Sequence, residues 1–221
     1  MDHSIHNLLT IEKEIQLKIS QDINLQKVPK IIAVSKTFPM SRILPLINHG
    51  HLNFGENKVQ EAIEKWESVK VDFSHLKLHM IGKLQKNKVK HAVSLFDYIH
   101  SLDNLKLAEK ISNEQLKQNR KLKIFIQVNI GNENQKSGIL SSELEIFSQK
   151  CVEEFGLNII GLMCLPPNDS KISSYFLEMK NLMNKINLKE LSMGMSNDYL
   201  EAIKFDTTYL RIGSKIFGNR N

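Results

Sequence analysis

The sequence predicts an α/β protein, a single (β/α)₈ TIM barrel over residues 1–221 with an extra helix at its N-terminus. Short apolar runs alternate with longer stretches of helical spacing, which is typical of parallel strands joined by helices. Eight such runs occur in 221 residues, a length that suits a compact barrel. Few residues follow the eighth run, so an outer helix is missing there, and the apolar N-terminal segment is expected to fill the gap.

The candidate strands are short runs rich in β-branched and apolar residues. In chain order they are 30–36 (KIIAVSK), 51–56 (HLNFGE), 77–82 (KLHMIG), 98–102 (YIHSL), 123–130 (KIFIQVNI), 158–165 (NIIGLMCL), 188–195 (LKELSMGM) and 208–214 (TYLRIGS). An open doubly wound sheet is the main alternative for this alternation.

Candidate helices lie between the strands. Five of them are 57–69, 104–119, 141–155, 174–186 and 197–205. The helical face of 104–119 is expected to carry Leu105, Ala108, Ile111 and Leu116. Ser196 precedes 197–205 and is expected to be its N-cap. The N-terminal helix is expected to bury Ile5, Leu8, Ile11, Ile15 and Ile19.

Composition excludes several classes of protein. No apolar stretch is long enough to span a bilayer, and the N-terminus does not have the pattern of a signal peptide, so a cytoplasmic protein is expected. Cys151 and Cys164 are expected to be buried free thiols, and no metal site is predicted. The net charge of +6 is diffuse. The basic run 83–91 lacks interleaved aromatic residues, so an RNA-binding barrel is the weaker hypothesis and no nucleic-acid partner is expected.

Three features converge at the carboxyl end of the predicted barrel, where active sites of this fold lie. Lys36 ends the first strand, SMGMSND follows the seventh, and RIGSKIFG continues from the eighth. Glycines, serine hydroxyls and free backbone N–H groups in the last two loops are suited to hold phosphate. An amine beside two such loops suits a phosphorylated aldehyde.

The same residues carry a family resemblance. AVSKTFP, FGENKVQEA, HMIGKLQKNKVK, QVNIGNENQKSG, GLMCLPP and LSMGMSNDYLEAI…YLRIGSKIFGNR occur in order from about residue 30 to the C-terminus. Together they resemble the signatures of the YggS/PROSC family of pyridoxal phosphate homeostasis proteins. The resemblance implies a barrel similar to the N-terminal domain of bacterial alanine racemase. Two departures are Lys83, where a smaller or aromatic residue is expected, and Ser214, where threonine is common.

The resemblance also implies a cofactor and its ligands. Pyridoxal 5′-phosphate (PLP) would form an internal aldimine with Lys36, and Arg211 would face the pyridine nitrogen. The phosphate would lie on Ser196, Gly213 and Ser214. Asn57 and Met195 complete the expected cofactor-binding set, with Met195 packing in the wall. The implied function is a non-catalytic one: PLP carriage or buffering in vitamin B6 and amino-acid homeostasis.

Alternatives stay open around this site. A cationic Arg211 beside the ring nitrogen disfavours its protonation and weakens the electron sink of PLP. Alanine-type racemases nevertheless function with an arginine there, so a PLP-dependent amino-acid racemase is the alternative function; those enzymes take a second acid–base residue from a further domain, for which this chain is too short. His79 is expected either to line the pocket or to lie in the core or on the surface, and Lys136 lies at the same mouth. PLP-dependent apoenzymes are the expected recipients, and a monomer is expected.

Overall fold

The computed structural model describes residues 2–23, 25, 27–133 and 135–218. Its eight strands close into a parallel barrel in the order β1 to β8, with β8 pairing with β1. The strands are β1 (Lys30–Val34), β2 (Asn53–Glu56), β3 (Lys77–Met80), β4 (Tyr98–Leu102), β5 (Lys123–Val128), β6 (Ile159–Cys164), β7 (Glu190–Met195) and β8 (Tyr209–Ile212). Each lies within its predicted run, so the barrel is confirmed and the open sheet is wrong.

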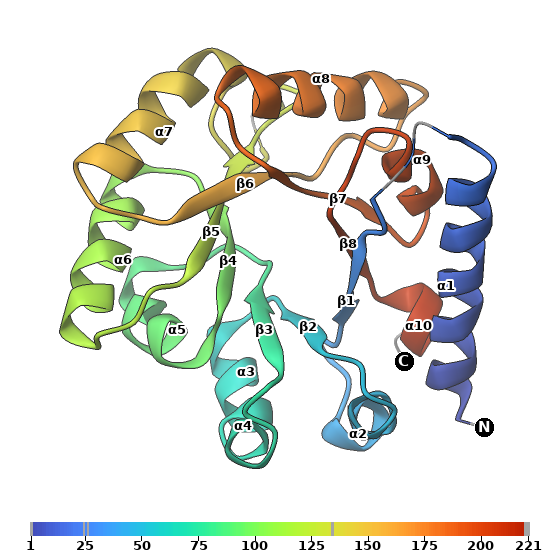
Figure 1. Cartoon of the computed structure of the whole chain (residues 1–221). Coiled ribbons are helices and arrows are strands. Elements are labelled where there is room, and N and C mark those ends of the chain that lie inside the picture. The colour runs from blue at the N-terminus through green and yellow to red at the C-terminus, as the bar shows by residue number, and fades with distance from the viewer. Residues whose placement is uncertain (1, 24, 26, 134, 219–221) are drawn as a thin grey trace.

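Helices surround the barrel (Figure 1). They are α1 (His3–Ser20), α2 (Met40–Asn48), α3 (Val59–Trp66), α4 (Val69–Asp72), α5 (Val89–Leu95), α6 (Leu105–Lys117), α7 (Leu144–Glu153), α8 (Ile172–Lys185), α9 (Tyr199–Ile203) and α10 (Ser214–Phe217), with 3₁₀ turns η1 (Lys86–Lys88) and η2 (Ser141–Glu143). The predicted helical segments correspond to α3, α6, η2 with α7, α8 and α9. One expectation is wrong: Leu116 of α6 is exposed, and Leu107 lies in the core instead.

The N-terminal helix covers the gap that the short α10 leaves in the ring. Helix α1 packs on α9, α10 and α2, and Figure 1 shows it beside α10. It buries Leu8, Ile11 and Ile15, as its periodicity predicts, while Ile5 and Ile19 pack at the edge of the core. Polar contacts add to this packing, because the Nζ of Lys215 in α10 donates to Glu14 of α1 at 2.8 Å and to the Tyr199 hydroxyl of α9 at 2.5 Å.

Alternate residues of each strand point to opposite faces, so the barrel has two buried layers. The outer layer, between strands and helices, is the large aliphatic cluster, to which the strands contribute residues such as Ile99, Leu162 and Leu210. The inner layer is the barrel interior. It contains a separate cluster of Ile32, Tyr98, Phe125, Met163 and Tyr209, together with the buried His79, His100, Ser192 and Arg211.

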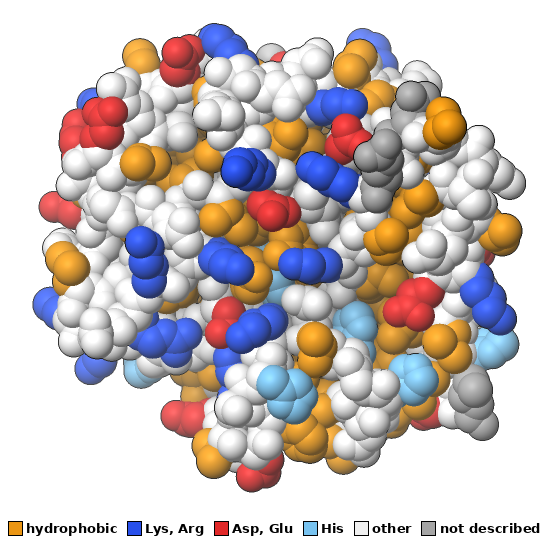
Figure 2. All heavy atoms as spheres, viewed as in Figure 1, with side chains coloured by type: hydrophobic (Ala, Val, Ile, Leu, Met, Phe, Trp, Pro, Cys, Tyr) orange, Lys and Arg blue, Asp and Glu red, His pale blue; other side chains and the backbone are white. Residues whose placement is uncertain are grey.

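Burial settles one further expectation. Cys151 and Cys164 are buried free thiols, as predicted, and burial raises the pKa of each to about 12. No helix in the described ranges has the length and apolar character needed to cross a membrane. Figure 2 shows lysine and arginine side chains scattered over one face of the molecule, several of them near its centre.

Candidate functional site

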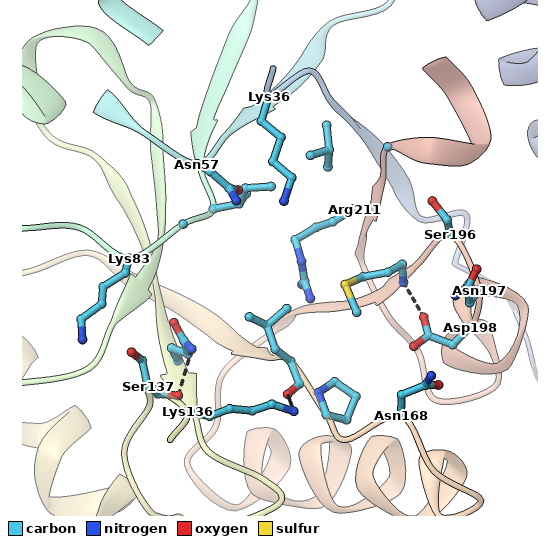
Figure 3. A pocket seen from close by; sticks show the side chains of 18 of the residues that line it. Lys36, Asn57, Lys83, Lys136, Ser137, Asn168, Ser196, Asn197, Asp198 and Arg211 are labelled. Carbon is cyan, nitrogen blue, oxygen red and sulfur yellow. Dashed lines mark hydrogen bonds between the residues drawn. The ribbon is translucent and has the colours of Figure 1, made fainter. Parts of the chain in front are cut away.

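A cavity of about 670 Å³ opens among the loops that follow the carboxyl ends of the strands. Its lining includes all seven residues predicted for the site: Lys36, Asn57, Met195, Ser196, Arg211, Gly213 and Ser214. They come from the loops after β1 and β2, from β7 and β8, and from the loops that follow these two strands. In Figure 3, the side chains of Lys36 and Arg211 point into the same space. The structure therefore brings the predicted residues together, although they lie as far apart in sequence as positions 36 and 214.

Lys36 lies in a tight turn two residues beyond the end of β1, where its side chain is half-buried. The next residue, Thr37, has a φ of 68°, which is uncommon for a β-branched residue. Its N–H donates to Glu61 of α3 at 2.5 Å. Strained backbone of this kind persists where the surrounding structure imposes it, and it often marks a functional position.

A buried ion-pair cluster stabilises the turn that carries Lys36. Glu56, the last residue of β2, accepts hydrogen bonds from the Ser35 hydroxyl at 2.8 Å and the Trp66 indole at 3.0 Å. Lys65 of α3 pairs with Glu56 at 2.7 Å and also donates to the Ser35 carbonyl at 2.8 Å. Burial raises the pKa of Glu56, and the Lys65 charge opposes that shift. The cluster thereby joins the strand ends that carry Lys36 and Asn57.

The loops after β7 and β8 are tied to each other. The β7–β8 register shifts between Ser192 and Met195, where Gly194 has a φ of +91°, just before β7 ends at Met195 and the loop of Ser196 begins. The Met195 N–H donates to the Asp198 carboxylate at 2.5 Å (Figure 3). The Lys215 N–H donates to the Ser196 hydroxyl at 3.3 Å. The expected N-cap role of Ser196 is wrong. Asp198 flanks α9, and the Ser196 hydroxyl serves the neighbouring loop instead.

Arg211 lies at the floor of the cavity and is only 4% exposed. Its Nη1 donates to the Ser192 carbonyl at 2.5 Å and the Ser192 hydroxyl at 2.7 Å, and its Nη2 donates to the Cys164 carbonyl at 2.7 Å. Burial lowers the pKa of Arg211, although a guanidinium stays charged in proteins. All three bonds within the described residues go to uncharged oxygens. A buried cation without a carboxylate partner is costly, so a ligand acceptor at the cavity would stabilise it.

The opposite rim carries polar groups that the sequence analysis left unassigned. Gln127 donates to the Ser137 carbonyl at 3.0 Å, and Lys136 pairs with Glu133 and donates to the Leu165 carbonyl at 3.3 Å. Other lining residues outside the prediction include Lys83, Asn168, Asn197 and Asp198. In the sequence, only their position indicates that they line the site, because each follows a strand closely. His79 is fully buried in the inner layer and is not among the lining residues.

Comparison with known proteins places these features in context. The family described as alanine racemase, N-terminal domain, matches residues 16–221. A pyridoxal phosphate homeostasis protein of Haemophilus influenzae is 35% identical over 98% of this chain and 95% of its own. A protein of the same name from Escherichia coli is 32% identical over 100% of this chain and 98% of its own.

Solved structures give the same relationship. PipY of Synechococcus elongatus with PLP bound superposes with a TM-score of 0.78 at 32% identity, covering 92% of this chain and all of its own. Alanine racemase of Clostridium difficile superposes with a TM-score of 0.74 at 12% identity, covering 100% of this chain and 57% of the racemase. The racemase likeness concerns the fold alone. The last two residues of the RIGSKIFGNR signature, 219 and 220, lie outside the described residues.

Proposed function

Because this chain belongs to the family of pyridoxal phosphate homeostasis proteins, which shares the N-terminal barrel of alanine racemase, we propose that it binds PLP and carries or buffers it. This role would serve vitamin B6 and amino-acid homeostasis. One observation carries the proposal: the Lys36 amine, the Arg211 guanidinium and the serine-bearing loops after β7 and β8 face one cavity. The PLP-bound structure of the related PipY supports the choice of ligand.

The residues present fit this cofactor. An amine can bond covalently to an aldehyde, and Lys36 supplies one at the mouth of the barrel. Hydroxyl groups of Ser196 and Ser214, with the backbone at Gly213, would hold the phosphate. Arg211 would donate to the pyridine nitrogen, since that buried cation has only neutral acceptors among the described residues. Asn57 and Met195 would form the wall.

The surroundings favour holding the cofactor over using it. PLP supplies an electron sink, which is strongest when an acid keeps its ring nitrogen protonated. Arg211 is a permanent cation, so it would donate a hydrogen bond to that nitrogen and oppose its protonation. Besides Lys36 and Arg211, the lining groups within the described residues that can carry a proton are Lys83, Lys136 and Asp198. Asp198 accepts from the Met195 N–H and Lys136 pairs with Glu133, so both are engaged in holding loops. We therefore propose a non-catalytic carrier that acts as a monomer and delivers PLP to apoenzymes in the cytoplasm.

Borohydride reduction tests the binding site. The PLP-loaded protein is reduced and digested, and peptide mass spectrometry locates the pyridoxyl-phosphate label. We expect the label on Lys36. Lys83→Ala, which removes a second lysine of the cavity lining, is the matched control and should leave the labelling unchanged. Label scattered over surface lysines, or none, would overturn the proposed site.

A second experiment separates the carrier from the racemase alternative. The PLP-loaded protein is incubated in D₂O with each proteinogenic amino acid, and exchange of the α-proton is followed by NMR. We expect no exchange above that caused by free PLP. Exchange that disappears in Lys36→Ala would instead establish an enzyme.

A further inference from the structure

A row of hydrogen-bonded side chains runs through the barrel interior from the cavity floor. Arg211 donates to the Ser192 hydroxyl, which lies 2.9 Å from His100 Nδ1. His100 Nε2 lies 3.0 Å from His79 Nδ1, and His79 Nε2 lies 3.1 Å from the Asn53 side-chain oxygen. The members come from β8, β7, β4, β3 and β2. We call these five residues the inner chain.

With the Asn53 side-chain oxygen facing His79, the donors and acceptors of the inner chain run in one direction. The Asn53 carbonyl oxygen accepts, so His79 Nε2 must carry the hydrogen and Nδ1 must accept in a neutral ring. His100 Nε2 must then donate to His79, which leaves His100 Nδ1 as an acceptor. The Ser192 hydroxyl therefore donates to His100 and keeps its lone pairs for Arg211.

Charges around the two histidines reinforce the neutral state. Burial is the main cause that lowers the pKa of both, to well below the usual 6.5. The charged or titratable groups that act on His79 are Lys30, His51, Lys70 and Lys123, and those that act on His100 are His79 and Arg211. All of these groups disfavour a further positive charge. Protonation would also set two N–H groups against each other at a bonded contact.

Ring packing fixes the chain in place. His79 stacks on Tyr98 with ring centroids 4.2 Å apart, and His100 stacks on Phe125 at 4.3 Å. The Tyr98 hydroxyl is not part of the inner chain and lies 3.3 Å from the Tyr209 hydroxyl. Each imidazole is therefore held by a neighbouring ring as well as by its two hydrogen bonds.

We propose that His79 and His100 are positioning residues that orient the Ser192 hydroxyl toward Arg211, so that the guanidinium, whose hydrogen bonds within the described residues go only to neutral oxygens, presents its positive charge to a lone pair of the ligand. The assignment of that ligand as PLP rests on the proposed function. A carboxylate in place of the histidines would neutralise Arg211. A neutral, one-directional chain holds the same group without cancelling its charge, and the cavity floor then recognises an unprotonated ring nitrogen.

The first test uses the protein without PLP. In a sample with ¹⁵N-labelled histidine, NMR reports the tautomer of each ring, with His79→Gln and His100→Gln used to assign the signals. We expect His79 and His100 to be neutral Nε2–H tautomers at pH 7 and to remain so at pH 5.5. An Nδ1–H tautomer would reverse the direction of hydrogen bonding along the inner chain and make Ser192 an acceptor from His100. That result, averaged tautomers, or titration near pH 6.5 would overturn the proposal.

The second test measures coupling in PLP binding. Ser192→Ala and His100→Phe are each expected to raise the dissociation constant of PLP by about tenfold. The double variant should raise it no further than either single variant, because both substitutions interrupt the same inner chain. Tyr98→Phe removes a hydroxyl that lies in the same layer but is not part of the inner chain, and this variant should bind PLP normally. Additive losses, or no loss in the single variants, would overturn the proposal.

The two tests also distinguish this inference from the proposed function. Thermal unfolding confirms that each variant is folded before binding is measured, and the tautomer measurement on the unmodified protein needs no variant beyond assignment. If PLP fails to attach to Lys36, the proposed function fails, whereas the tautomers still decide whether the inner chain exists.

Discussion

The two buried layers of this barrel are built from neighbouring residues of the same strands, yet they differ in chemistry. In β4, Ile99 points into the outer layer, whereas Tyr98 and His100 point into the inner layer. In β8, Leu210 is outward and Arg211 is inward. The outer layer is largely aliphatic and rests on close packing, while the inner layer consists mainly of rings and hydrogen-bonded polar groups.

This difference shows how the barrel separates stability from ligand recognition. Apolar burial stabilises a fold in proportion to area and has no preferred direction. Buried polar groups contribute less net stability, but an unsatisfied partner is costly, so a connected network fixes one arrangement. The inner layer can therefore position Arg211 while the outer layer supplies most of the free energy of unfolding.

The most direct test of this difference between the layers is to substitute adjacent residues on opposite faces of β4. Ile99→Ala should lower the free energy of unfolding by about 2–5 kcal/mol, because it removes fully buried aliphatic volume from the outer layer. Molecules that remain folded should still label Lys36 fully with PLP. Urea denaturation and borohydride labelling measure the two effects on the same samples.

His100→Gln is the comparison variant and should show the opposite balance, a smaller loss of stability with a larger loss of PLP affinity. If Ile99→Ala reduced PLP affinity as much as His100→Gln, the two layers would not be functionally separate.

The pH dependence of stability is a second test of the difference between the layers, because His79 and His100 lie in the inner layer. His79 and His100 have lowered pKa values in the folded protein, so the unfolded chain binds more protons as pH falls below about 6.5. The free energy of unfolding should fall with pH there, by up to about 1.4 kcal/mol per pH unit for each histidine. His51, whose pKa burial lowers to about 4, contributes in the same sense, whereas the raised pKa of Glu56 acts in the opposite sense.

Urea denaturation at pH 7.5, 6.0 and 5.0 measures this slope. Ile99→Ala should shift the whole curve downward without changing its slope, and His79→Gln should make the slope shallower. An unchanged slope in His79→Gln would mean that this histidine takes up its proton over the same pH range in the folded and the unfolded protein.

The sequence was most informative about the outer layer and the cavity mouth. Strand runs show their apolar content locally, and parallel strands place their carboxyl ends together, so Lys36 and the loops after the seventh and eighth strands could be assigned to one mouth from their positions. The family signatures supplied the role of Arg211 and the assignment of the phosphate to Ser196, Gly213 and Ser214 individually.

The inner chain could not be predicted in the same way. His79 and His100 are 21 residues apart, and Ser192 is 92 residues beyond His100, so only the barrel register brings them together. A single histidine in a strand gives no local signal of its partner. The Ser196 cap failed for a related reason, because the Lys215 N–H that Ser196 accepts from lies in α10, beyond the next strand.

The last prediction tests whether packing in the outer layer positions the loop that borders the cavity. Gly194 has a φ of +91°, and a Cβ there would lie 2.7 Å from Ala202 Cβ and from Leu210 Cδ2. Gly194→Ala should therefore cost about 1–3 kcal/mol of stability and also weaken PLP binding, because Met195 and Ser196 follow it directly. Urea denaturation and a PLP titration measure both effects.

Gly156→Ala is the matched control, since Gly156 also has a positive φ, +61°, but no atom lies within 4 Å of the added Cβ. It should cost only about 1 kcal/mol, from backbone strain alone, and leave PLP binding unchanged. Equal effects of the two substitutions would show that strain, and not the contact with Ala202 and Leu210, governs position 194. The loop of Ser196 would then be placed by its own hydrogen bonds to Asp198 and Lys215, independently of the outer layer.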